Sequence, residues 1–278
     1  MLIVSGTLLV LFTWIVAAFI VVGLGSIPAV LLEMRYTSPV QGCLLVRTAM
    51  WWGLPIAAIA VMLLNQLWPL HSLPAGLAVL GASLASAVVS ALLARRLTIR
   101  WTRPSLPPAA LALGLALLAA VVFLALAALG PVTNYDSGLY HLGAVRYASD
   151  YPAIPGIANL YFALGYGNAE FPLAAIFGNG PWQMEGFRLL NGFVIALAVL
   201  DLCLRWRRKP TTGFFILLAG LLVSLVPMIA LSDYWVTSPT QDSFVFIVTV
   251  VASAYLADGV TARRWTTPTA IAVALAAT

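Results

Sequence analysis

Residues 109–141 read AALALGLALLAAVVFLALAALG and then PVTNYDSGLYH, and the change between these two halves decides the fold. The first half, 109–130, has no charged residue and exceeds the roughly 20 residues that a helix needs to cross a bilayer. Its apolar residues run continuously and do not alternate, which favours a helix over a strand of a closed barrel. Pro131 and the polar residues after it cannot continue such a span. The stretch therefore predicts a membrane helix that ends at a polar segment on the membrane surface.

The same alternation of apolar runs and polar segments extends over the whole chain. Of its 278 residues, 62% are hydrophobic and only 8% are charged, whereas soluble domains carry roughly 25% charged residues. We therefore expect an all-α, polytopic transmembrane helix bundle of seven or eight spans, with a large outer loop that bears short juxtamembrane helices. The predicted spans are 3–32, 48–66, 75–94, 109–130, 186–204, 212–231 and 243–257, and an incomplete eighth run begins at 269.

These runs divide the chain into three parts. Residues 1–130 hold the first four spans, 131–185 form an extracytoplasmic loop that carries the expected site, and 186–278 hold the remaining spans. Because the last apolar run is too short to cross a bilayer, we expect the chain to be a C-terminally truncated fragment of a longer protein.

The basic residues indicate how the bundle is oriented. Twelve of the fourteen fall on alternate connections, and only Arg146 and Arg188 fall on the other side. By the positive-inside rule the larger group faces the cytoplasm. We expect a multi-pass protein of the bacterial inner (plasma) membrane, surrounded by lipids, with the N-terminus and the 131–185 loop extracytoplasmic. The net charge of +5 comes from short clusters that form no basic face, so no nucleic-acid partner is expected. No pattern indicates an oligomeric state.

The 131–185 loop opens with the pattern of a short surface helix. Asn134 is placed to accept a hydrogen bond from an N–H group of the first helical turn. Leu139, Leu142 and Val145 then recur at helical spacing, which predicts an amphipathic helix lying on the membrane surface. Turns rich in Pro and Gly follow from Tyr151 onward, and we expect them to separate this helix from one or two others.

Asp136 would lie in the first turn of this helix, with Tyr140 on the same face. An aspartate at a helix start is most often a cap, and aromatic residues gather at membrane interfaces irrespective of function. Ionisable groups at membrane level, however, are costly and tend to mark functional sites. The loop and the helix after it gather several of them in a chain with little charge elsewhere: Asp136, His141, Arg146, Glu170 and Arg188.

Two segments resemble a known class of membrane enzymes. Asn134-Tyr-Asp-Ser-Gly-Leu-Tyr-His141, followed by Arg146 and by Tyr151-Pro-Ala-Ile-Pro-Gly-Ile-Ala-Asn-Leu160, resembles the first large outer loop of bacterial glycosyltransferase-C proteins. Ser238-Pro-Thr-Gln-Asp242 resembles a Ser-Pro-x-x-Asp segment that opens a later helix in that group. The resemblance covers about residues 125–250. Proteins of this class are polytopic and use polyprenyl-phosphate sugars.

The resemblance implies a glycosyltransferase, either a hexosyl- or a pentosyltransferase, that acts with inversion. It would transfer a sugar from a polyprenyl-phosphate donor to an extracytoplasmic glycan, lipid or protein. Asp136 would be the general base that takes the proton of the acceptor hydroxyl. The lipid phosphate would leave as an anion stabilised by positive charge and hydrogen-bond donors. The residues expected to bind substrate are Tyr140, His141, Arg146, Asn159, Asn168, Glu170, Arg188 and Asp242. No cofactor is required beside the lipid-linked donor, and no Asp-x-Asp or paired Glu-Asp motif in the loop supports a divalent metal.

Three of these residues have structural alternatives in which they take no part in catalysis. His141 can pack against Asp136 as a hydrogen-bonded partner, which its apolar neighbours favour. Arg146 can meet a lipid phosphate on the membrane surface. Arg188 can pair with Glu185, three residues earlier.

The remaining polar residues also have simpler structural roles. Asn168 and Glu170 can cap a short helix in the loop, and Asp242 can cap the seventh span behind Pro239.

Three other functions are weighed against the glycosyltransferase. A polysaccharide polymerase or ligase would centre its outer loops on Arg and His, whereas acids outnumber bases on the outer side here. A transporter or flippase would carry polar or charged residues within its spans, or two related halves with broken helices. The predicted spans are nearly free of charge, with Asp201 near a helix end. A non-enzymatic membrane subunit is the third alternative.

Overall fold

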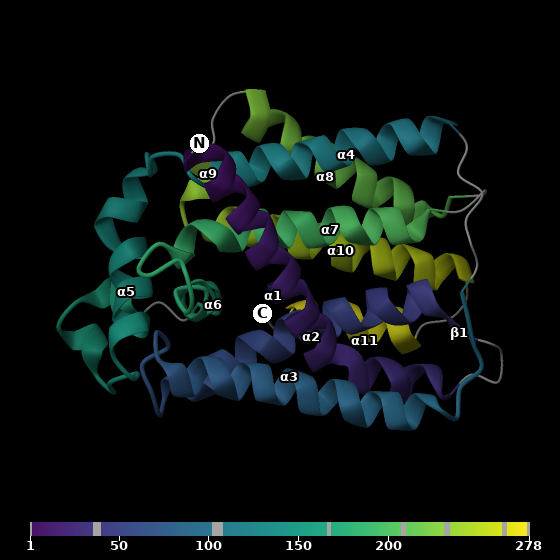
Figure 1. The fold of residues 1–278 in the computed structure, drawn as a ribbon, viewed down its shortest axis with the longest axis horizontal. Coiled ribbons are helices and arrows are strands. Elements are labelled where there is room, and N and C mark those ends of the chain that lie inside the picture. The colour runs from purple at the N-terminus through teal and green to yellow at the C-terminus, as the bar shows by residue number, and fades with distance from the viewer. Residues whose placement is uncertain are drawn as a thin grey trace.

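The fold is a bundle of long apolar helices in a computed structural model that describes residues 2–35, 40–101, 108–165, 168–206, 210–230, 234–262 and 266–276 (Figure 1). Six of the described helices are long and apolar enough to cross a membrane, and a seventh apolar helix, Thr212–Val226, is shorter. The expected all-α polytopic bundle is thus confirmed. The six long helices are Ile3–Glu33, Gly42–Asn65, Leu73–Ala94, Ala110–Ala127, Gly186–Arg205 and Gln241–Thr261.

The predicted elements are found close to their expected bounds. The α-helices are α1 (Leu2–Glu33), α2 (Gly42–Asn65), α3 (Leu73–Ala94), α4 (Pro108–Ala127), α5 (Leu142–Asp150), α6 (Glu170–Ile176), α7 (Leu190–Arg205), α8 (Thr212–Ala230), α9 (Tyr234–Thr237), α10 (Gln241–Ala262) and α11 (Thr266–Ala276). Four short helices of other types are η1 (Ser137–His141), η2 (Ile157–Asn159), η3 (Phe162–Gly165) and η4 (Gly186–Leu189). Two strands of two residues each, β1 (Val40–Gln41) and β2 (Ile99–Arg100), pair in parallel.

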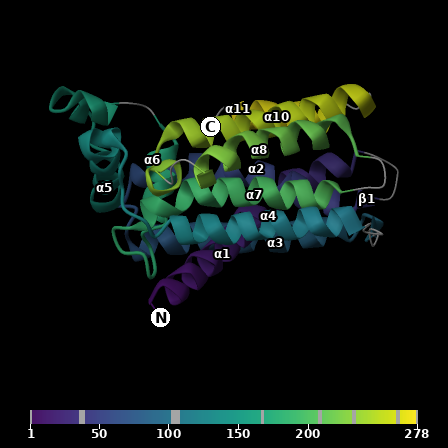
Figure 2. The ribbon, with the colours of Figure 1, turned by 90° about the horizontal axis from the view of Figure 1, so that it is seen from above.

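The long helices lie side by side along the long axis of the molecule, and α1 crosses the others obliquely (Figures 1 and 2). The strands lie at one end of the bundle, and α5 and α6 lie at the opposite end. We call these the strand end and the loop end. The described helix ends that flank the connections assigned to the cytoplasm lie at the strand end, and the described part of the 131–185 segment lies at the loop end. Of the basic residues used for that prediction, six lie outside the described residues: Arg103, Arg207, Arg208, Lys209, Arg263 and Arg264.

Helices α1 and α2 approach each other closely because glycines face the contact. A Cβ atom added to Gly53 would overlap the carbonyl oxygen of Val21, and one added to Gly25 would overlap that of Ala49. Small residues at such contacts allow helix backbones to pack directly, which replaces the hydrophobic driving force that is missing between helices in lipid. This pair of glycines therefore fixes how α1 lies across the bundle.

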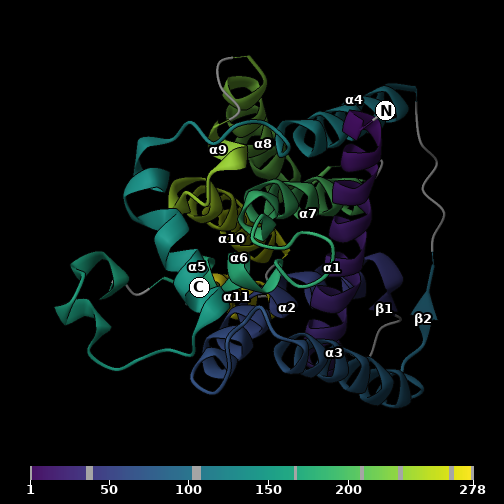
Figure 3. The ribbon, with the colours of Figure 1, turned by 60° about the vertical axis from the view of Figure 1, so that its left-hand side comes forward.

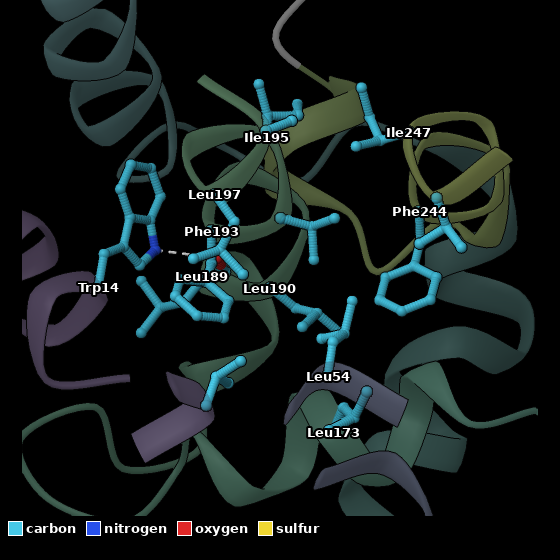
Figure 4. Packing of buried hydrophobic residues seen from close by; sticks show 14 of the residues in the cluster. Trp14, Leu54, Leu173, Leu189, Leu190, Phe193, Ile195, Leu197, Phe244 and Ile247 are labelled. Carbon is cyan, nitrogen blue, oxygen red and sulfur yellow. Dashed lines mark hydrogen bonds between the residues drawn. The ribbon is translucent and has the colours of Figure 1, made fainter. Parts of the chain in front are cut away.

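Helix α7 lies in the middle of the core (Figure 4). Its start is held by α1, because the Trp14 indole N–H donates to the Leu189 carbonyl oxygen at 2.9 Å. Leu190 and Phe193 are almost fully buried, as is Phe244 on α10. Since α7 follows directly on the outer loop, this packing anchors one end of the 131–185 segment to the core.

A buried ion-pair network closes the strand end between α2, α7 and α10. Asp201 is fully buried and pairs with both Arg47 and Arg205, the latter at 3.0 Å. Arg205 also pairs with Asp258 at 2.5 Å, and its guanidinium carbon lies 4.4 Å from the centre of the Tyr255 ring. The sequence analysis assigned Arg47 and Arg205 to connections, whereas both lie within helices and are buried. Pairing with the carboxylates makes this burial tolerable, since an unpaired buried charge is far more costly.

Candidate functional site

The surface helix predicted at the head of the outer loop is present. Asn134 caps its first turn as expected, because the Ser137 backbone N–H donates to the Asn134 Oδ1 atom at 3.3 Å. Helix α5 then lies across the loop end of the bundle, near α6 (Figure 3). It turns Ala144, Val145 and Ala148 inward, which gives it the predicted amphipathic character.

The first turns of this helix differ from the prediction because they form a π-helix, η1. The Leu142 N–H donates to the Ser137 carbonyl oxygen five residues earlier, and π-turns of this kind are rare and often found at functional sites. The wider turn changes which side chains face the protein. Leu139 is 50% exposed instead of buried, and His141 is buried in its place. Asp136 stays exposed but is close enough for its charge to act on His141.

His141 is the centre of the arrangement and is only 3% exposed. Its ring packs against Tyr140 at a centroid distance of 4.4 Å and against Phe171 of α6 at 5.6 Å. Burial lowers the pKa of His141, and the carboxylates of Asp136 and Asp242 act in the opposite direction. The balance keeps His141 neutral at pH 7, with a buried Nδ1 atom that has no hydrogen-bond partner among the described residues.

Glu170 is the second buried titratable group and opens α6. Its backbone N–H donates to the Asn168 Oδ1 atom at 2.6 Å, which is the capping role considered for Asn168. Its side chain is buried, and neither carboxyl oxygen has a hydrogen-bond partner in the described part of the chain. Burial raises the pKa of Glu170 to about 8, and the nearby charge of Asp242 adds to this rise. Glu170 is therefore mostly protonated at neutral pH.

The two exposed carboxylates, Asp136 and Asp242, come from segments far apart in the sequence. A hydrogen bond of 2.5 Å between the hydroxyl groups of Ser137 and Ser238 joins these segments directly. The result is a cluster at the loop end made of Asp136, Tyr140, His141, Glu170 and Asp242, which we call the loop cluster. No group of three or more His, Cys, Asp or Glu side chains in the described ranges is arranged to hold a metal ion.

Asn191 of α7 supports this arrangement, and the sequence analysis did not single it out. Its Nδ2 atom lies within hydrogen-bond distance of the carbonyl oxygens of Trp235, Ser238 and Thr240, at 2.9–3.2 Å. The Asn191 side chain thus holds the link between α9 and α10 against the core. The only feature of the sequence that pointed to Asn191 was its uncharged amide within an apolar run.

The two arginines expected to bind substrate lie apart from the loop cluster. Arg146 is exposed on α5 and pairs with Asp150 at 3.4 Å. Arg188 pairs with Glu185, the alternative considered from the sequence, and its Nη1 atom also donates to the Gly130 carbonyl oxygen. Arg188 therefore fastens η4 to the end of the fourth span.

Asn159, the last of the expected binding residues, is exposed in η2, on the part of the loop that extends beyond α5 (Figure 3). This part is tied back to the surface helix by the Tyr161 hydroxyl, which donates to the Leu139 carbonyl oxygen at 2.9 Å. No contact among the described residues brings Asn159 to the loop cluster.

Comparison with known proteins places the chain in a family. Residues 8–278 match the family model described as "Domain of unknown function (DUF8201)", which is nearly the whole chain. The chain belongs to the DUF8201 family. No curated protein and no solved structure matches it. The family description names no activity, so the function of this DUF8201 member is inferred from its own residues.

Proposed function

We propose that the chain is a membrane glycosyltransferase resembling the glycosyltransferase-C class, with the loop cluster as its active site. The observation that carries the proposal is the Ser137–Ser238 hydrogen bond. It connects the two segments that resemble that class, although they lie about a hundred residues apart in the sequence.

In the proposed reaction Asp136 is the general base. Its carboxylate is exposed at the start of η1, so it can reach an acceptor hydroxyl without a change of the backbone. As the acceptor oxygen bonds to the anomeric carbon, Asp136 takes its proton, and the bond from that carbon to the lipid phosphate oxygen breaks. The polyprenyl phosphate leaves as an anion, and the configuration at the anomeric carbon is inverted.

The buried members of the loop cluster would orient the reacting groups. Neutral His141 adds no positive charge beside Asp136. Protonated Glu170 can donate a hydrogen bond to a substrate oxygen. Arg146 and Arg188 lie apart from the cluster and each is paired with a carboxylate, so the proposal assigns neither of them to the lipid phosphate.

The proposed setting is a bacterial inner membrane with the loop end outside. Its support is the distribution of basic residues, because among those that the structure describes only Arg146 and Arg188 belong to the loop end. In cells, a cysteine introduced at the exposed Gln183 should react with a membrane-impermeant maleimide. A cysteine at Arg96 should react only after the membrane is permeabilised, and the reverse pattern would overturn this orientation.

The decisive experiment measures sugar transfer in membranes from a panel of radiolabelled polyprenyl-phosphate sugars. Asp136→Asn should lower transfer by about 10²–10⁴-fold, the usual contribution of a general base, at unchanged expression. Gln66→Ala, which alters an exposed side chain outside the loop cluster, is the control and should retain activity. If Asp136→Asn transfers sugar as fast as the unmodified chain, Asp136 is a helix cap and the mechanism is wrong. If no sugar is transferred at all, a polymerase or ligase, a transporter or a membrane subunit becomes the better interpretation.

The ion-pair network at the strand end is the one observation that favours a transporter. It places charged residues inside the bundle, as transport proteins do at their binding sites. However, Asp201 and Asp258 balance the charges of Arg47 and Arg205, and a site for a charged substrate needs charge that is not already compensated. We therefore rank transport below glycosyl transfer.

A further inference from the structure

Two hollows at the loop end lie outside the loop cluster and share one wall. The first, of about 290 Å³, is lined by Leu129, Pro181, Trp182, Gln183, Glu185 and Arg188. The second, of about 240 Å³, lies between α5 and α6 and is closed by the 184–187 segment. Glu185 lines both, so the two hollows adjoin each other.

The first hollow has rigid walls. The Trp182 indole N–H donates to the Thr13 hydroxyl of α1 at 2.8 Å, which fixes the plane of its ring. Arg188 is held by Glu185 on one side and by the Gly130 carbonyl oxygen on the other. Side chains that are already fixed lose little entropy when a ligand binds.

The chemistry of these walls selects a neutral ligand rich in hydroxyl groups. The charge of Arg188 is compensated by Glu185, so the first hollow has no excess charge for a phosphate or carboxylate. What it offers is an apolar wall from Leu129, Pro181 and the small accessible part of the buried Trp182. Three planar polar groups come from Gln183, Glu185 and Arg188. A pyranose presents the matching surfaces, namely an apolar face of C–H groups and a ring of hydroxyl groups that both donate and accept hydrogen bonds.

The second hollow has a lining of the same kind, with room for one more sugar unit. It has apolar walls from Val145 and Phe187, with Arg146 and Glu185 as its charged groups. Arg146 is likewise compensated, here by Asp150. Each hollow is close to the lower end of the roughly 300–1,000 Å³ of small-molecule sites, which suits one sugar ring per hollow.

We propose that the two hollows on either side of Glu185 bind a neutral oligosaccharide, one sugar unit in each. In the context of the proposed function, on which this identification of the acceptor rests, they make the acceptor a glycan of at least two units. The Gly130–Arg188 contact connects the first hollow to the start of the segment that carries Asp136. The bound glycan would then present its terminal hydroxyl toward the loop cluster.

The test uses the full chain in lipid nanodiscs, free of glycoside detergents. Saturation-transfer NMR measures binding of maltose, cellobiose and N,N′-diacetylchitobiose, with inorganic phosphate as an anionic comparison followed by phosphorus NMR. At least one disaccharide should bind. Gln183→Ala, which removes an exposed carboxamide, should weaken that binding about tenfold, as expected for loss of a hydrogen bond and its partner contacts. Gln66→Ala, an exposed carboxamide elsewhere at the loop end, should leave binding unchanged.

The outcomes separate this inference from the proposed function. Asp136→Asn should bind the disaccharide normally even though it transfers no sugar. If a disaccharide binds but no variant or donor supports transfer, the hollows are a carbohydrate site and the proposed reaction is wrong. The inference is overturned if no disaccharide binds, if phosphate alone binds, or if Gln183→Ala binds as tightly as the unmodified chain.

Discussion

Replacing Glu170 by Gln tests the buried half of the loop cluster. The folded protein raises the pKa of this carboxyl group from 4.5 to about 8 because the side chain is buried without a partner. Between these two pH values the folded state holds a proton that the unfolded state has lost. Stability must therefore be highest below pH 4.5 and must fall as the pH rises toward 8. Above pH 8 both states are ionised and the loss is complete.

The size of the effect follows from the same two pKa values. Each pH unit between them is worth about 1.4 kcal/mol, so ionising Glu170 costs the fold up to roughly 5 kcal/mol. Glutamine cannot ionise and removes this cost. Its amide is buried without partners, as is the protonated carboxyl group that it replaces, so the substitution changes stability little where Glu170 is protonated. The variant should thus be about as stable as the unmodified chain near pH 5 and more stable near pH 9.

The assay is thermal unfolding in detergent micelles, followed by tryptophan fluorescence from pH 5 to 9. Glu185→Gln is the matched control, because its carboxylate is half exposed and already paired with Arg188. The melting temperature of Glu185→Gln should still fall as the pH rises. The melting temperature of Glu170→Gln should change much less with pH. Parallel pH profiles for Glu170→Gln and the unmodified chain would refute the conclusion that Glu170 is protonated in the folded protein.

Two further predictions concern the bundle. Gly53→Ala should destabilise the protein by roughly 1–3 kcal/mol, because the new methyl group overlaps the Val21 carbonyl oxygen of α1. Gly81→Ala, where an added Cβ meets no atom within 4 Å, should melt like the unmodified chain, and equal melting of both variants would contradict the close α1–α2 contact. Asp201→Asn should cost roughly 3–5 kcal/mol and reduce the amount of folded protein in membranes, since Arg47 and Arg205 would lose their shared carboxylate. Recovery of normal amounts of Asp201→Asn protein would show that the network is dispensable.

The span pattern could be predicted from the sequence for a simple physical reason. In lipid each backbone polar group must find its hydrogen-bond partner within the same helix. A long, continuous apolar run that crosses the membrane is therefore a helix. The run at 109–130 accordingly became α4, and Asn134 became the cap of the helix after it. These features depend on neighbours in the sequence. The amphipathic surface helix was predictable on the same grounds, apart from the π-turn at its start.

The arrangement of the site was decided by tertiary structure. The π-turn of η1 accompanies the packing of His141 against Phe171, and no pattern in the local sequence predicted it. The prediction that Arg47 lies in a connection was wrong. The partner that makes its burial possible, Asp201, lies in another helix and is distant in the sequence.

The sequence by itself determined an all-α membrane bundle with a polar loop between its fourth and fifth spans, since membrane insertion depends on composition and length. Only the tertiary structure decided that Ser137 meets Ser238, that Glu170 is buried without a partner, and that Arg188 is held by Gly130. These contacts join residues that are distant in the chain. Their existence depends on how helices pack, and helix packing is governed by shape complementarity that no single run of residues contains.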